Sequence, residues 1–219
     1  MFNRLWHSMC RILLLLSLIL LICVKSHADP DYVTQITKPI PTKIEMPKVN
    51  IHKGSKILDI QDVSQTIDHV FSNVSNLKEK HSLKNLVLET MMVETHLGGA
   101  PYQSAEKRYR NYGIAQFREE SAKYVLQLLK KRDKLAYDDL MKYYFKNKSL
   151  RYNISYNVPF SIGLCAEYYL TRDKNVNKKI STLSKRAQIW KKEYNTYKGL
   201  GTVNAYVSRV KQFKGKTYN

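Results

Sequence analysis

Residues 85–100 of the chain read NLVLETMMVETHLGGA, and a basic connection joins them to NYGIAQF at residues 111–117. The apolar residues around the first segment fall on all sides of a helix with 3.6 residues per turn. One side holds Leu83, Leu86, Val87 and Leu97, and the other holds Leu88, Met91 and Met92. A helix that is apolar nearly all round is a buried one. The sequence therefore predicts a central buried helix, which we expect Gly98-Gly99 to end.

Glu94 lies in the last turn of this predicted helix, four residues after Thr90 and three before Leu97, on its apolar side. Because burial disfavours the charged form of a carboxyl, we expect a raised pKa at Glu94. A carboxyl whose pKa approaches neutrality can serve as a general acid. The alternative is an ordinary surface glutamate near a helix C-terminus. The glycines that follow and the second segment favour the catalytic interpretation.

The second segment places the amide of Gln116 in an otherwise apolar run that begins with a glycine, Tyr112-Gly113-Ile114-Ala115-Gln116-Phe117. A polar side chain in such a run is suited to orient a ligand. A glutamine at a helix start or in a loop is the alternative interpretation. Gln116 is therefore a candidate binding residue.

Both segments belong to a series of four motifs that continues toward the C-terminus. The motifs are Glu94-Thr95, Gly113-Ile114-Ala115-Gln116, Gly163 followed by Tyr168-Tyr169-Leu170, and Glu193-Tyr194-Asn195 with Gly199 and Tyr206. Their order and spacing, over about Leu83 to Val210, resemble the soluble lytic transglycosylases and, more distantly, the goose-type lysozymes. The chain departs from that pattern after Asn195, where Thr196-Tyr197-Lys198-Gly199 replaces Ala-Gly, and in the basic stretch before Asn111.

This resemblance implies one mostly α, lysozyme-like domain that cleaves the MurNAc–GlcNAc β-1,4 bond of peptidoglycan. In such enzymes one glutamate protonates the leaving sugar and then acts as base on the muramoyl 6-hydroxyl, giving a 1,6-anhydro product without a metal or cofactor. The resemblance makes Glu94 this acid/base. Residues expected to bind the substrate or shape its site are Thr95, Gln116, Tyr194 and Asn195 from the motifs, and Tyr112 as an aromatic face for a sugar ring.

A hydrolytic glycosidase needs a second carboxylate beside the acid. Glu89 is five residues before Glu94, about 140° away around a helix, so the two cannot face one bond. Glu119 and Glu120 follow Gln116, but acidic residues there are typical of a helix N-terminus. A single useful carboxyl fits the transglycosylase reaction, and a hydrolytic lysozyme remains an alternative.

The N-terminal part of the chain predicts export. Residues 1–28 have a basic start, an apolar run from Ile12 to Val24 and Ser26-His27-Ala28 as a cleavage site, which together are typical of a secretory signal peptide. The run is shorter than the roughly 20 residues of a membrane span, although an uncleaved N-terminal anchor is an alternative. Residues 29–56 contain four prolines and predict an extended linker. We expect the domain at residues 57–215 to act in the periplasm or outside the cell.

The charge composition indicates which classes of binding partner to expect. Without residues 1–28, 34 basic residues stand against 18 acidic ones, a net charge of +16 that favours anionic polymers. For an exported protein we expect peptidoglycan glycan strands as the partner, with no nucleic acid. Wall remodelling for an envelope-spanning secretion or conjugation apparatus is a further analogy. A non-catalytic, basic envelope-binding protein on the same scaffold is the alternative from another class.

The remaining cysteine and histidines predict no metal or disulfide chemistry. Cys165 is the one cysteine after residue 28, it cannot form an intramolecular disulfide, and its apolar surroundings predict a buried position. The histidines lack ligand spacing. The further apolar periodicities predict helices over 59–76, 119–131, 137–145, 158–170, 183–194 and 202–213.

Overall fold

The computed structural model describes residues 58–97 and 111–216, and within these ranges the chain forms helices and no β-strand. The predicted mostly α fold is confirmed. The segments predicted as signal peptide and linker, and the stretch from Gly98 to Arg110, lie outside the described residues. None of the described helices combines the length and apolarity that a membrane crossing requires.

Helix α3 (Ile60–Asn73) and helix α4 (His81–Thr95) form the first part of the domain, joined by the short 3-10 helix η1 (Ser75–Leu77). Asp59 caps the start of helix α3, because its side chain accepts a hydrogen bond from the amide of Gln61 and so satisfies an otherwise unpaired donor. Helix α4 is buried on nearly all sides, as predicted. Its end differs from the prediction, because His96 already adopts the left-handed conformation with φ of 53°.

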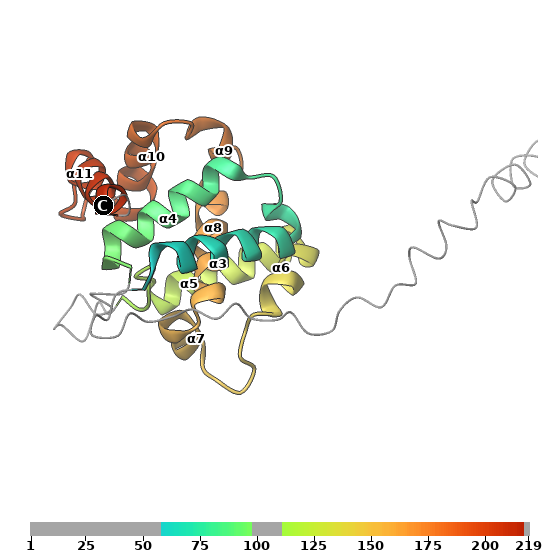
Figure 1. Ribbon diagram of the computed structural model, residues 1–219. Helices are drawn as coiled ribbons and strands as arrows, with labels where there is room; N and C mark the ends of the chain where they lie inside the picture. The colour runs from blue at the N-terminus through green and yellow to red at the C-terminus, as the bar shows by residue number, and fades with distance from the viewer. Residues whose placement is uncertain (1–57, 98–110, 217–219) are drawn as a thin grey trace, which may run out of the picture. The chain divides into compact units, whose positions relative to one another are not determined.

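Helix α8 (Val158–Arg172) lies at the centre of the domain (Figure 1). Its residues from Pro159 to Leu170 are all buried, and the predicted burial of Cys165 is confirmed. Asn157 starts the helix by accepting a hydrogen bond from the Phe160 amide, with Pro159 in the first turn. Around α8 pack α3, α4, α5 (Glu119–Arg132), α6 (Lys134–Met141) and α7 (Leu150–Tyr156).

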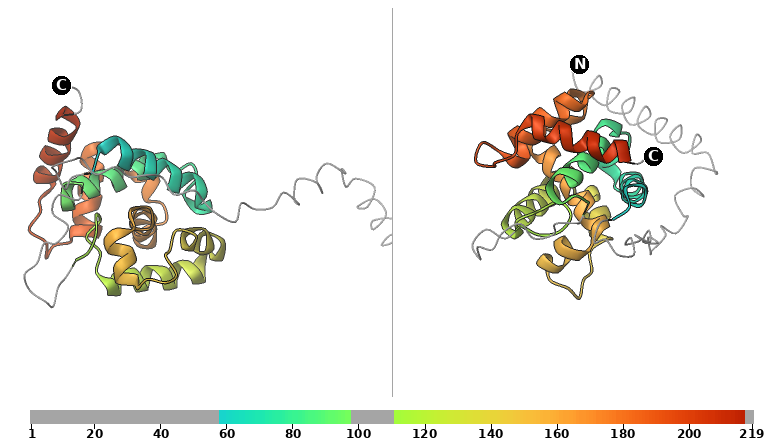
Figure 2. Two further views of the ribbon diagram at one scale, coloured as in Figure 1. Left: turned by 60° about the horizontal axis from the view of Figure 1, so that its bottom comes forward. Right: turned by 60° about the vertical axis from the view of Figure 1, so that its left-hand side comes forward.

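The C-terminal elements are α9 (Val176–Lys179), α10 (Leu183–Ile189), η2 (Trp190–Asn195) and α11 (Val203–Lys216). Helix α11 packs on α10 and α4, and the views in Figure 2 show α10 and α11 side by side. The single helix predicted over 183–194 is in fact α10 followed by η2, a π-helix. Helices α7 and α9 were not predicted, because they are short and carry little apolar periodicity.

Candidate active site

A cleft of about 740 Å³ opens at the C-terminal end of α4. The turn at residues 111–118, η2, the loop after η2 and α11 form its other sides. Its described lining consists of Val93, Glu94, Asn111, Gln116, Phe117, Arg118, Ser121, Tyr168, Trp190, Tyr194, Asn195, Thr196, Lys198, Gly199, Leu200, Gly201, Ala205 and Arg209. Four predicted site residues, Glu94, Gln116, Tyr194 and Asn195, therefore meet in one cleft.

Glu94 is half-buried in the last turn of α4, and its carboxylate accepts a hydrogen bond from the indole N–H of Trp190, with 2.9 Å between Nε1 and Oε1. Burial raises the pKa of Glu94 above its ordinary value. The Trp190 hydrogen bond and the positive charge of Arg209 act in the opposite direction but do not cancel the effect of burial. The direction of this pKa shift is the one that favours a general acid.

Trp190 is the first residue of η2, and its ring is packed on two sides. Its ring packs on Tyr206 of α11, with 5.1 Å between the ring centroids. A Cβ atom on Gly201 would lie 2.4 Å from the Trp190 ring, so only glycine lets the loop after η2 pass this closely. Packing on both sides thus fixes the direction in which the indole donates to Glu94.

The turn that carries Gln116 is tied directly to the residue after Glu94. The Thr95 hydroxyl donates to the carbonyl oxygens of Met91 at 3.1 Å and Ile114 at 2.9 Å. Thr95 is fully buried and does not line the cleft. These bonds hold the turn against α4, and the contact of Thr95 with substrate stays a prediction.

Backbone hydrogen bonds shape this turn as a small hairpin. Tyr112 and Phe117 exchange amide–carbonyl bonds of 2.8 and 2.9 Å. Gly113 has φ of 70°, and a Cβ atom there would lie 1.8 Å from the Ile154 carbonyl oxygen, so this position requires glycine. The side-chain amide of Gln116 donates to the Gly113 carbonyl at 3.0 Å. This bond holds Gln116 in the lining of the cleft.

Tyr112 is placed at the base of the hairpin and not in the cleft. The guanidinium of Arg151 lies over its ring, 5.3 Å from the centroid. Its proposed stacking on a sugar ring therefore corresponds to no surface of the described cleft. The structure places Tyr112 at the base of the turn, and its contact with substrate stays a prediction.

Tyr194 joins η2 to the hairpin. Its hydroxyl donates to the Ala115 carbonyl, and its ring stacks on Tyr169 and meets Tyr168 edge to face, with centroids 5.4 and 5.1 Å away. Tyr194 and Tyr168 of this aromatic cluster line the cleft, and the Tyr194 hydroxyl is already used within the protein.

Asn195 shapes the loop that follows. Its side-chain oxygen accepts a hydrogen bond from Lys191 Nζ at 2.8 Å, and the same ammonium bonds the carbonyls of Thr196 and Gly199. The loop that departs from the family pattern is therefore closed by one lysine. Asn195 also lines the cleft.

Glu94 is the only carboxylate among the described lining residues. Glu89, on the same helix, is fully buried and accepts hydrogen bonds from both Arg186 Nε and Nη2, at 2.7 and 2.8 Å. Glu119 pairs with Lys123 and Arg151 at the start of α5. Two of the three candidate second carboxylates, Glu89 and Glu119, therefore form ion pairs outside the described cleft lining.

Trp190 and Arg209 were missed from the sequence. Arg209 donates to the Val93 carbonyl at 2.8 Å, next to Glu94. The usable signal for Trp190 was that it is the only tryptophan after residue 28 and lies four residues before Tyr194. Nothing in the local pattern around Arg209 marks it, because its role depends on the packing of α11 against α4.

The described residues contain no group of three His, Cys, Asp or Glu side chains arranged to hold a metal ion. Comparisons of the chain with protein-family models, curated proteins and solved structures found no match. Function is therefore inferred from the residues and geometry of the cleft.

Proposed function

We propose that this protein is an exported peptidoglycan lytic transglycosylase with a lysozyme-like domain, in which Glu94 is the general acid and base. The observation that carries the proposal is a single cleft carboxyl with a raised pKa, held by an indole N–H. The motif order from Glu94 to Tyr206 supports the same assignment. The predicted signal peptide supports a location outside the cytoplasmic membrane, where peptidoglycan lies.

The hydrogen bond from Trp190 selects the oxygen that carries the proton. An N–H donor needs an acceptor, and in a carboxylic acid the carbonyl oxygen is the better one. Oε1 accepts from the indole, so in the acid form the proton resides on Oε2. Glu94 is thereby prepared to donate from one defined atom.

The reaction proceeds in two proton transfers. Oε2 of Glu94 protonates the oxygen of the leaving GlcNAc as its bond to C1 of the muramoyl residue breaks. The Glu94 carboxylate then takes the proton of the muramoyl 6-hydroxyl, whose oxygen forms the new bond to C1. The products together have the composition of the substrate, since no water is added, and Glu94 returns to its acid form.

A single carboxyl is sufficient for this reaction because the nucleophile belongs to the substrate. A hydrolase must in addition activate water or form a covalent intermediate with a second carboxylate. Among the described lining residues none can take that role beside Glu94. The bound muramoyl residue is expected to contact Gln116 and the aromatic cluster around Tyr194.

The test is a digest of purified peptidoglycan by the mature protein and by Glu94→Gln, with products identified by mass. The proposal predicts 1,6-anhydro-muropeptides from the wild type and a rate at least about 100-fold lower from the variant, which is the usual size of a general acid contribution. Products heavier by one water identify a hydrolytic lysozyme. No product from the wild type, with the protein bound to the wall, identifies a non-catalytic binding protein.

A further inference from the structure

Three cations line the cleft around its one carboxylate. They are Arg118 at the start of α5, Lys198 in the loop after η2 and Arg209 on α11. They come from separate elements and so surround the cleft. A cleft lined by charges of one sign concentrates the field inside it. A sugar chain without charge is not attracted by such a field.

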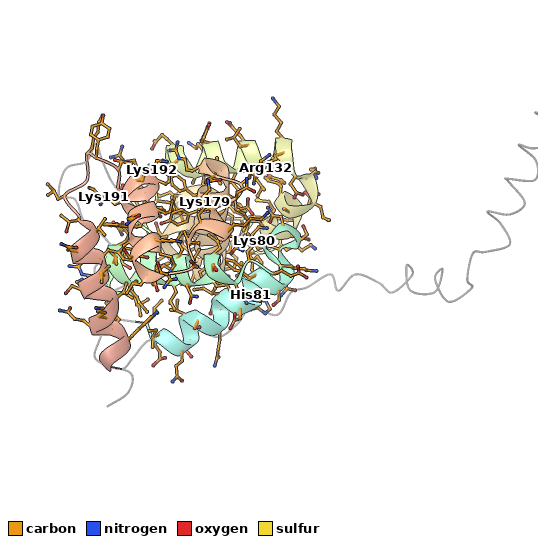
Figure 3. All side chains as sticks on the ribbon, turned by 90° about the horizontal axis from the view of Figure 1, so that it is seen from above. Lys80, His81, Arg132, Lys179, Lys191 and Lys192 are labelled. Carbon is orange, nitrogen blue, oxygen red and sulfur yellow. The ribbon has the colours of Figure 1, made fainter. Side chains whose placement is uncertain are left out.

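The excess of basic residues in this protein extends beyond the cleft, where some of them have acidic partners. Figure 3 labels several basic residues that do not line the cleft, and three of them pair with acidic side chains. Arg132 pairs with Glu167 at 2.9 Å, and Lys192 pairs with Glu193 at 3.0 Å. Lys179 likewise pairs with Asp173. The described cleft lining has three cations and one carboxylate, and the pKa of that carboxylate is raised.

The cations also differ in their depth. Arg209 is half-buried beside Glu94 and uses one nitrogen for the Val93 carbonyl, so its guanidinium has further N–H donors. Arg118 and Lys198 are exposed. An anionic ligand that enters the cleft therefore meets two exposed cations and a deeper one next to the acid.

We propose that the cleft selects glycan strands that carry carboxylate-bearing peptide substituents, and that Arg118, Lys198 and Arg209 hold those carboxylates. This inference rests on the proposed function, because it names the form of peptidoglycan that the same cleft takes. Strands whose substituent carboxylates are neutralised are poor substrates even though their sugar backbone is unchanged.

This recognition also favours the chemical step. The charge of Arg209 lowers the pKa of Glu94. A substrate carboxylate placed beside Arg209 offsets that charge, so Glu94 holds its proton to higher pH when the correct strand is bound. Binding of the anionic substituent and readiness of the acid are thereby linked.

The experiment compares two preparations of one peptidoglycan, untreated and with its carboxylates coupled to methylamine by carbodiimide, which keeps the peptides but removes their negative charge. At low salt we expect kcat/KM on the untreated wall to exceed that on the amidated wall by about 5-fold or more. Each of Lys198→Gln and Arg118→Gln should lower the rate on untreated wall about 2- to 5-fold, the range for exposed ion pairs, and lower it less on amidated wall.

Lys185→Gln is the matched control, since it removes an exposed lysine of α10 that does not line the cleft. Equal cleavage of the two walls, or an equal loss in Lys185→Gln, overturns the inference and leaves the proposed function standing. Binding of the Glu94→Gln variant to the untreated and the amidated wall is measured as well, because it tests recognition of charge without cleavage. Absence of cleavage by the wild type overturns the proposed function, and equal binding of both walls by this variant overturns the charge recognition.

Discussion

Trp190 donates to Glu94 with its indole N–H, while Glu89, five residues earlier on α4, accepts hydrogen bonds from Arg186, Tyr206 and Lys214. Glu89 is fully buried and paired with charge, whereas Glu94 is half-buried and its pKa is raised. The two glutamates therefore contribute differently to stability. Glu89 holds α10 and α11 to α4. Burial of the Glu94 carboxylate lowers the stability of the fold, and in return it raises the pKa of the candidate general acid.

The first prediction compares Glu94→Gln with Glu89→Gln. When the pKa of a carboxyl is higher in the folded state than in the unfolded state, the protein loses stability as the pH rises from the unfolded-state pKa through the folded-state pKa. At pH 7 Glu94→Gln removes that cost, so its melting temperature should equal or exceed that of the wild type while activity is lost. Glu89→Gln should cost about 3 to 5 kcal/mol, because Arg186 stays buried without its charge partner.

Thermal unfolding of both variants at pH 4 and pH 7 makes this comparison. Any stability gain of Glu94→Gln should be smaller at pH 4, where the wild-type carboxyl is protonated. A Glu94→Gln variant that unfolds at lower temperature than the wild type at pH 7 would make Glu94 a structural residue.

The second prediction concerns the pH profile. The charge of Arg209 lowers the pKa of Glu94, so Arg209→Gln should raise it and keep the acid form to higher pH. In this variant the fall of kcat on the alkaline side of its pH profile (the alkaline limb) should shift to higher pH. Arg209→Lys retains the charge and should leave the limb near its wild-type position. An unchanged limb in Arg209→Gln would show that another group controls it.

At the scale of elements, the hairpin and η2 bring the candidate site together. Thr95 ties the hairpin to α4, and Tyr194 ties η2 to the hairpin through the Ala115 carbonyl. π-helices are rare and occur often at functional sites. Here η2 supplies Trp190, Tyr194 and Asn195 to the cleft from one short segment.

The third prediction tests the hairpin with Gly113→Ala. Alanine at a left-handed φ costs about 1 to 2 kcal/mol, and the added Cβ also meets the Ile154 carbonyl, so we expect a loss of about 2 kcal/mol or more in the free energy of unfolding. Wall cleavage should fall further than stability alone explains, because Gln116 moves. Denaturant unfolding and a digest measure the two effects.

Gly215→Ala is the matched control for this variant. A Cβ atom at Gly215 meets nothing within 4 Å, and alanine is the better residue inside a helix such as α11. It should be neutral or slightly stabilising. Similar losses in the two alanine variants would contradict the role assigned to the hairpin.

Helix positions were largely predictable at this scale. The predictions over 59–76, 119–131, 158–170 and 202–213 each match a helix of the structure within a few residues. The end of α4 was wrong because the chain turns at His96, before the glycines, and the register of backbone hydrogen bonds there is not encoded in a glycine pattern. The change from α10 to a π-helix likewise leaves no mark in apolar periodicity.

At the scale of the whole molecule, the fourth prediction concerns export. If residues 1–28 form a cleaved signal peptide, material recovered from the cell envelope or medium begins at Asp29 by N-terminal sequencing. We expect cleavage because the apolar run is short for a membrane span and is followed by a small-residue site. An intact N-terminus on the exported protein would identify an anchor instead.

Local sequence determined the helical class, the burial of α4 and α8, the position of Glu94 on the apolar side of its helix and the candidate Gln116, while Tyr194 and Asn195 became candidates through the motif resemblance. These features follow from apolar periodicity and short motifs, which record the environment of each residue along its own helix or turn. Tertiary structure alone decided that Trp190 meets Glu94, that Arg209 lies beside it, that Glu89 is bound by Arg186, and that Thr95 and Tyr112 lie outside the cleft. Each of these facts depends on contacts between segments far apart in the chain, and such contacts are set by the packing of whole helices rather than by the pattern of any one of them.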